Sequence, residues 1–132
     1  MDKVHTSNAI DSGVTIGHVH LKVANIERSL AFYCGVLGFE LMQRYGSEAA
    51  FVSAGGYHHH VGLNTWYSKD GSPPQRSTTG LFHIAIRYPN RAALADALHQ
   101  ALPDTFHQSL VDKRGMLCVV MCSHKVEALV LV

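Results

Sequence analysis

The stretch His18-Val-His-Leu-Lys-Val-Ala-Asn25 returns 65 residues later as His83-Ile-Ala-Ile-Arg-Tyr-Pro-Asn90. The offset aligns His with His, aliphatic with aliphatic, basic with basic and Asn with Asn. A repeat of this kind predicts two copies of one supersecondary unit, and a unit of about 65 residues is too small to bury its sheet face alone. We therefore expect two similar halves that pack against each other.

The first copy predicts a strand over residues 15–23, because apolar and polar residues alternate there. His18 and His20 then lie on the same face of that strand. Asn25 is placed to cap a helix, which two following glycines end. Three more strands are predicted, over residues 39–45, 49–54 and 57–66. The first half thus has the predicted order β-α-β-β-β.

The second copy predicts a strand over residues 81–88, and Asn90 is placed to cap a helix that Pro103 stops. Shorter strands are predicted over residues 106–111, 116–122 and 125–132. The fold class is therefore α+β, with two βαβββ modules in a pseudo-twofold arrangement around a shared cavity. The expected division is a polar tail (1–14) and one domain (15–132), which comprises module one (15–67), a linker (68–80) and module two (81–132).

Composition excludes several classes of partner. Lys and Arg number 11 against 10 Asp and Glu, without a long basic run, so neither nucleic acid nor an anionic membrane is expected. The three cysteines lie in apolar stretches, as reduced thiols of a cytoplasmic protein would. The N-terminal residues match neither a signal peptide nor a membrane span. Ten histidines, concentrated in a few segments, favour metal or acid/base chemistry on a small molecule.

Several motifs together resemble one family. They are the opening His-Val-x-Leu-x-Val strand, Ser29-Leu-Ala-Phe-Tyr33, Val36-Leu-Gly-Phe39 and Phe82-His-Ile-Ala-Ile86. The chain is similar to the vicinal oxygen chelate superfamily, which includes glyoxalase I, extradiol ring-cleaving dioxygenases, fosfomycin-resistance thiol transferases and bleomycin-binding proteins. The segment from Gly56 to Trp66 resembles single-module relatives of catechol 2,3-dioxygenase. The resemblance implies a glyoxalase-like sheet cavity.

The resemblance also implies three metal ligands, His18, His83 and Glu127. Two imidazoles and one carboxylate form the facial triad of non-haem Fe(II), with Mn, Ni or Zn as alternatives. The repeat pairs His18 with His83 independently of the family. Their alternative interpretation is as ordinary hydrogen-bonded core histidines, and for Glu127 it is as an edge-strand carboxylate in solvent.

The same offset applied to Glu127 gives Gly62, so the first half lacks the carboxylate that glyoxalase I uses there. By strand alternation His58 and His60 should share the Gly62 face, and His59 should face the other way. His58 and His60 are the candidate acid/base groups; for His60, a fourth metal ligand or a polar lining group are the alternatives. Candidate substrate-binding residues are His20, Tyr57, Trp66 and Phe82.

The C-terminal segment departs from the family, because the usual turn before the ligand strand is shorter and differs in sequence. Three functions stay open. The first is an extradiol dioxygenase acting on a small catecholic or other vicinal-oxygen substrate. The second is a metal-dependent isomerase or lyase of glyoxalase type, and the third is a binding protein of bleomycin-resistance type. Within this family a homodimer is favoured over a monomer.

Overall fold

The computed structural model describes residues 9–75, 77–81, 83–101 and 127–131. In order, the elements are β1 (Val19–Lys22), α1 (Ile26–Leu30), the π-helical segment η1 (Ala31–Val36), β2 (Glu40–Tyr45), β3 (Ala49–Ser53), β4 (Val61–Asn64), β5 (His83–Arg87), α2 (Arg91–Ala101) and β6 (Glu127–Leu131). This mixture confirms the α+β class.

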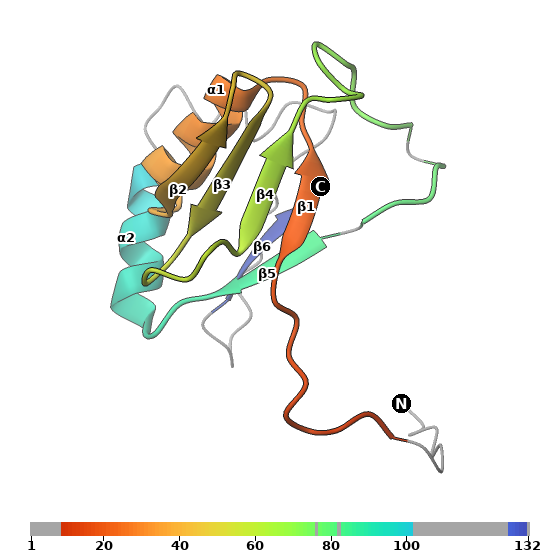
Figure 1. The fold of residues 1–132 in the computed structure, drawn as a ribbon. Helices are drawn as coiled ribbons and strands as arrows, with labels where there is room; N and C mark the ends of the chain where they lie inside the picture. The colour runs from red at the N-terminus through yellow and green to blue at the C-terminus, as the bar shows by residue number, and fades with distance from the viewer. Residues whose placement is uncertain (1–8, 76, 82, 102–126, 132) are drawn as a thin grey trace.

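The first half forms one four-stranded sheet in the order β1-β4-β3-β2 (Figure 1). β1 runs parallel to β4, whereas β3 is antiparallel to both of its neighbours, β4 and β2. The predicted order β-α-β-β-β is confirmed for this half. The strand predicted over residues 57–66 is shorter, because Gly55 and Gly56, with φ of 66° and 76°, begin a turn that continues to β4.

The helix between β1 and β2 begins and ends where the sequence predicts. The Asn25 side chain accepts a hydrogen bond from the Arg28 backbone N–H at 2.9 Å, as an N-cap does. Gly38 follows the helical residues with φ of 82°, a conformation that other residues rarely adopt. The helix buries Ile26, Tyr33 and other apolar side chains against the sheet.

The core lies between this helix and one face of the sheet. Leu21, Val52, Val61 and Leu63 are each at most 4% exposed and belong to one cluster with the helix residues. Because side chains alternate along a strand, the other face of β1 carries polar side chains such as His20. In Figure 1 the helices lie behind and beside the sheet, and this open face is turned toward the viewer.

The second half contributes a two-stranded antiparallel sheet, β5-β6, and the helix α2. Asn90 caps α2 through a hydrogen bond of 2.9 Å from the Ala93 backbone N–H. Leu94 is buried, and Ile84 and Ile86 pack against the core of the first half. The predicted strands over residues 106–111 and 116–122 lie outside the described residues.

The pairing of β6 differs from what the repeat implies. The last strand of the first half, β4, runs parallel to β1, but β6, which the repeat places at the corresponding position, runs antiparallel to β5. Residues 65–75 and 77–81, between β4 and β5, contain neither helix nor strand. No helix among the described residues is long and apolar enough to cross a membrane.

Candidate metal centre

His18 and His20 lie side by side on the open face of the first sheet. Leu21 of β1 is buried against the helix, so the residues that alternate with it along the strand face outward. The ring centroids of His18 and His20 are 5.2 Å apart, and both side chains are exposed. The prediction that the two histidines share a face is confirmed.

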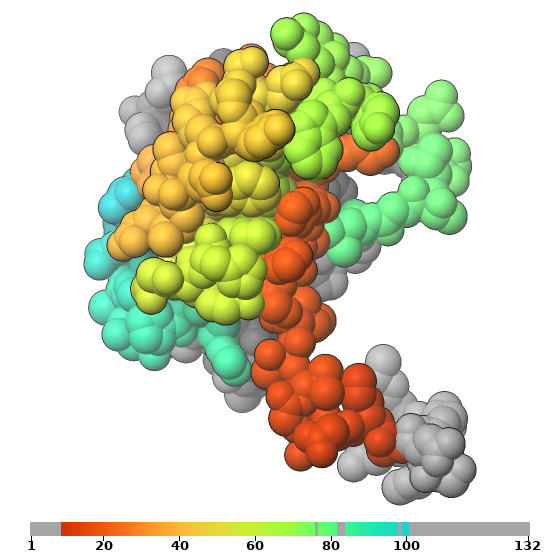
Figure 2. All heavy atoms as spheres, viewed as in Figure 1, coloured from red at the N-terminus to blue at the C-terminus, as the bar shows by residue number. Residues whose placement is uncertain are grey.

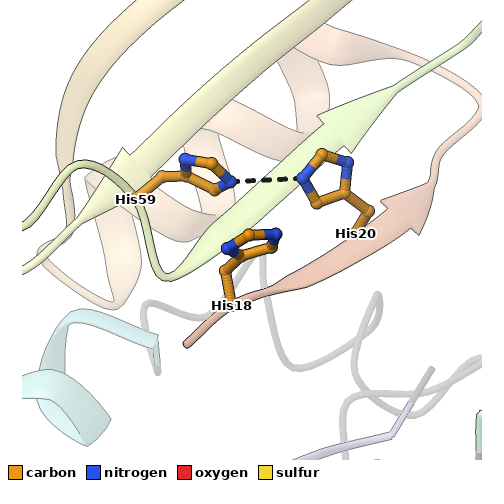
Figure 3. A group of neighbouring side chains, drawn as sticks. All are labelled: His18, His20 and His59. Atoms are coloured by element: carbon orange, nitrogen blue, oxygen red, sulfur yellow. Dashed lines mark hydrogen bonds between the residues drawn. The ribbon is translucent and has the colours of Figure 1, made fainter. Parts of the chain in front are cut away.

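His59 joins them from the turn that precedes β4. Its Nε2 lies 3.2 Å from Nε2 of His20, and its ring centroid lies 4.4 Å from that of His18. Figure 3 shows the three rings converging above β1 and β4, and Figure 2 shows this turn lying against the start of β1 on the surface. The prediction that His59 faces away from this site is wrong, because β4 begins at Val61 and strand alternation does not extend back to residue 59.

Gly62 explains how the His20 ring can lie so close to the sheet. Residues 20 and 62 are direct neighbours in the β1–β4 ladder. A Cβ atom at position 62 would stand 2.8 Å from Cδ2 and Nε2 of the His20 ring, which is closer than real Cβ contacts. The imidazole of His20 therefore occupies the space above Gly62 that a carboxylate side chain at this position would need.

The three histidines offer a set of nitrogen ligands. One ring nitrogen from each of His18, His20 and His59 lies within 4.8 Å of the other two. Phe51 lies below them, with its ring 5.9 Å from that of His20 and 5.0 Å from that of His59. Neutral imidazoles above an apolar floor are suitable ligands for a divalent transition metal. His18, one of the ligands that the resemblance implies, therefore lies among groups that fit such a metal.

The surroundings of His59 favour its neutral form. Burial lowers the pKa of His59, and the nearby imidazoles of His18, His58, His20 and His60 lower it further. A metal binds the deprotonated imidazole nitrogen, so a lowered pKa reduces competition from protons. The crowding of histidines thus keeps His59 available as a ligand at neutral pH.

Comparison with known proteins identifies the family of the chain. The model of the Glyoxalase/Bleomycin resistance protein/Dioxygenase superfamily matches residues 15–105. The chain belongs to this superfamily. The matched residues include the whole four-stranded sheet and all five histidines around the site.

One curated relative in the superfamily is the catechol-2,3-dioxygenase of Bacillus subtilis (strain 168). It is 40% identical to this chain over 87 residues, which are 65% of this chain and 30% of the relative. The match thus spans less than a third of that relative's length. No solved structure matches the chain.

The two histidines predicted as acid/base groups, His58 and His60, have different surroundings. His58 borders the group of three, with its ring 5.6 Å from that of His18 and 4.5 Å from that of His59. His60 is turned toward β3, where its Nδ1 lies 2.9 Å from Ser53 Oγ and accepts a hydrogen bond from the Ala54 N–H at 3.3 Å. An accepting nitrogen carries no hydrogen, so neutral His60 is protonated on Nε2.

The aromatic residues predicted to bind substrate differ in their distance from the three histidines. Tyr57 lies beside the site, with its ring 4.2 Å from that of His58 and 4.8 Å from that of His60. Trp66 follows the other end of β4 and is 49% exposed. Phe82 lies outside the described residues. Of the described candidates, Tyr57 therefore lies beside the three histidines, and His20 is one of the three.

The other two predicted metal ligands lie on the second sheet, and the structure describes their backbone. His83 is opposite Leu131 in the β5–β6 ladder, whereas Glu127 is opposite Arg87. The two residues stand at opposite ends of a five-residue ladder, which is about 13 Å along a strand. Their assignment as ligands, together with His18, stays a prediction.

Proposed function

We propose that the chain is a metal-dependent, extradiol-dioxygenase-like protein that acts on a small catecholic or other vicinal-oxygen substrate. Its superfamily and its similarity to a catechol-2,3-dioxygenase support this chemistry. The observation that carries the proposal is the position of His18, on the open sheet face beside two further imidazoles. We place the protein in the cytoplasm, as a homodimer.

The proposed ligand set is His18, His83 and Glu127, held by two βαβββ modules around a pseudo-twofold axis, within one chain or across the dimer. Fe(II) is the proposed metal, with Mn, Ni or Zn as alternatives. Fe(II) bound there would supply open coordination positions for the substrate oxygens and the redox chemistry of ring opening. The side chains around it have to orient the substrate and move its protons.

His58 is the residue best placed to accept a proton from a catechol hydroxyl. It borders His18 and His59, and both of its ring nitrogens are free of the backbone bond that fixes the His60 tautomer. His60 presents an N–H at Nε2 and is suited to donate a hydrogen bond rather than to accept a proton. Tyr57 packs on both histidines and can form one wall for a flat ring.

The test is the metal content of protein purified without chelator, followed by oxygen uptake with catechol. Wild type and His99→Ala, an exposed histidine on α2, should bind iron and consume oxygen, whereas His18→Ala should do neither. Equal metal content in wild type and His18→Ala would contradict the proposal.

The two acid/base candidates are compared by kinetics. His58→Ala should lower kcat by roughly 10²–10⁴-fold, the usual contribution of a general acid or base, without loss of iron. His60→Ala should lower kcat less, because its Nε2 already carries a proton. The same loss in both variants, or a larger loss for His60→Ala, would exclude this division of roles.

A second function, a non-catalytic binding protein, is favoured by one observation. The antiparallel β5–β6 register places His83 and Glu127 at opposite ends of their ladder. In that case catechol should bind, as measured by calorimetry, while iron-loaded protein consumes no oxygen. A glyoxalase-type activity has less support, because the His20 ring occupies the space above Gly62 where that enzyme's carboxylate would stand.

A further inference from the structure

We propose that His18, His20 and His59 by themselves bind one divalent ion of the Zn²⁺, Cu²⁺ or Ni²⁺ kind, so that the first half of the chain supplies every protein ligand. This inference goes beyond the proposed function, because neither His20 nor His59 belongs to the ligand set of the dioxygenase. It also assigns His59, for which strand alternation predicted no role in the site.

The distance between the two Nε2 atoms fits a shared ion. Zinc–imidazole bonds are about 2.0–2.1 Å long, so two nitrogens on one ion stand about 2.9 Å apart at a right angle and about 3.4 Å apart at the tetrahedral angle. The observed separation of His20 and His59 is 3.2 Å. The third nitrogen, on His18, lies within 4.8 Å of both, so at most about 1.4 Å separates it from the tetrahedral spacing, and the exposed ring can close this gap by rotation.

The backbone fixes two of the ligands relative to each other. His20 sits in the β1–β4 ladder opposite Gly62. His59 precedes His60, whose backbone N–H donates to Val52 O at 2.9 Å and whose carbonyl accepts from the Val19 N–H at 3.0 Å. Both histidines are therefore anchored to the same sheet within a few residues, and little loop entropy is lost when an ion binds.

The donor set selects the class of metal. Imidazole ligands suit Zn²⁺, Cu²⁺, Ni²⁺ and iron, whereas Mg²⁺, Ca²⁺ and Mn²⁺ prefer oxygen ligands. Among the described residues, the group of candidate ligands here contains only histidines. Three protein ligands also leave a coordination position open, as in catalytic zinc sites.

A metal-free alternative predicts the same 3.2 Å distance. One neutral imidazole can donate its N–H to the other, which requires complementary tautomers on His20 and His59. The two explanations differ in what an added ion does. If the contact is only a hydrogen bond, these metals should bind no more tightly to the three histidines than to the exposed histidines elsewhere on the protein.

Calorimetric titration of the full chain with Zn²⁺ tests the ligand set. His20→Ala and His59→Ala should each weaken binding by at least about tenfold, since even the loss of groups that only orient a ligand costs 10–100-fold. His99→Ala should change it by less than about twofold. The discriminating variant carries His83→Ala and Glu127→Gln together, and it should retain the ion. Loss of the ion in that variant, with retention in His20→Ala, would overturn the inference.

Gly62→Ala tests the site without removing a ligand. The new Cβ would stand 2.8 Å from the His20 ring, so the ring has to leave its position, and Zn²⁺ affinity should fall at least about tenfold. Gly80→Ala, where a Cβ meets nothing within 4 Å, is the matched control. In a His20→Ala background Gly62→Ala has no ring to displace and should have no further effect. An unchanged affinity of Gly62→Ala in the wild-type background, with its circular dichroism intact, would contradict the site.

The two proposals can fail separately. Zinc binding that depends on His20 and His59, without oxygen uptake by the iron-loaded protein, would support this site and exclude the dioxygenase. Oxygen uptake that survives His20→Ala and His59→Ala, together with unchanged zinc affinity, would support the dioxygenase and overturn the three-histidine site.

Discussion

The two halves of the chain start from similar sequences and form different sheets. His18 to Asn25 and His83 to Asn90 both form a strand followed by a helix with an Asn cap. β1 then pairs in parallel with β4, whereas β5 pairs antiparallel with β6. Local sequence is therefore sufficient for the strand and the cap, and insufficient for the choice of the partner strand.

The reason lies in how each partner strand is held. β4 is paired on both sides, with β1 and with β3, and its four residues are all buried. β6, the partner of β5, is paired with β5 alone among the described strands. A central strand has its register specified by burial on both faces, whereas the register of a two-stranded ladder depends on fewer contacts.

The largest expected effect is on stability, when core side chains of β4 and β5 are truncated and compared. Leu63→Ala in β4 removes a side chain that is 1% exposed, and should lower the free energy of unfolding by about 2–5 kcal/mol. Ile86→Ala in β5 removes a half-buried side chain packed against the same core, and should cost less. Urea denaturation of both variants measures the difference. Equal losses would mean that β5 is as well packed as β4.

A second difference between the halves should show in alkaline solution. Burial raises the pKa of Tyr33 from 10.0 to about 12. Below the unfolded-state pKa of 10 both states keep the phenol proton, and above it the unfolded state ionises first. The free energy of unfolding should therefore fall as pH rises from 10 toward 12, by roughly 2–3 kcal/mol in all.

Tyr33→Phe should remove this component, so the difference between variant and wild type is measured by urea unfolding from about pH 9 to about pH 11.5. Burial also raises the pKa of Tyr88, but Tyr88 is only half-buried, and Tyr88→Phe should change the pH dependence less. A wild-type curve that runs parallel to that of Tyr33→Phe would show that Tyr33 titrates alike in both states.

The sequence predicted the parts of the site that local patterns control. Alternation in β1 placed His18 and His20 on one face, and the offset to Gly62 identified a missing carboxylate. It could not show that the His20 ring lies on Gly62, because that contact depends on the parallel register of two strands about 40 residues apart in the chain.

His59 was assigned to the wrong face because the strand prediction began too early. Gly55 and Gly56, one residue before the run of three histidines, indicate a turn, and a turn of this length places the first residues after it outside the regular alternation. The second half was predicted less well for a related reason. The repeat predicts both β5 and β6, because β6 follows β4 by about the same 65 residues, but it does not predict that β6 runs antiparallel to β5.

The smallest expected effect tests where the two halves agree. Asn25 and Asn90 occupy the same position in the repeat, and each accepts one hydrogen bond of 2.9 Å from the backbone N–H three residues later. Asn25→Ala and Asn90→Ala should each lower the free energy of unfolding by about 1 kcal/mol, the usual cost of losing an N-cap. Asn25→Ser and Asn90→Ser, which keep a capping oxygen, should recover most of it. If Asn90→Ala costs nothing while Asn25→Ala costs the full amount, α2 unfolds without the first half, and the resemblance between the halves ends at their sequence.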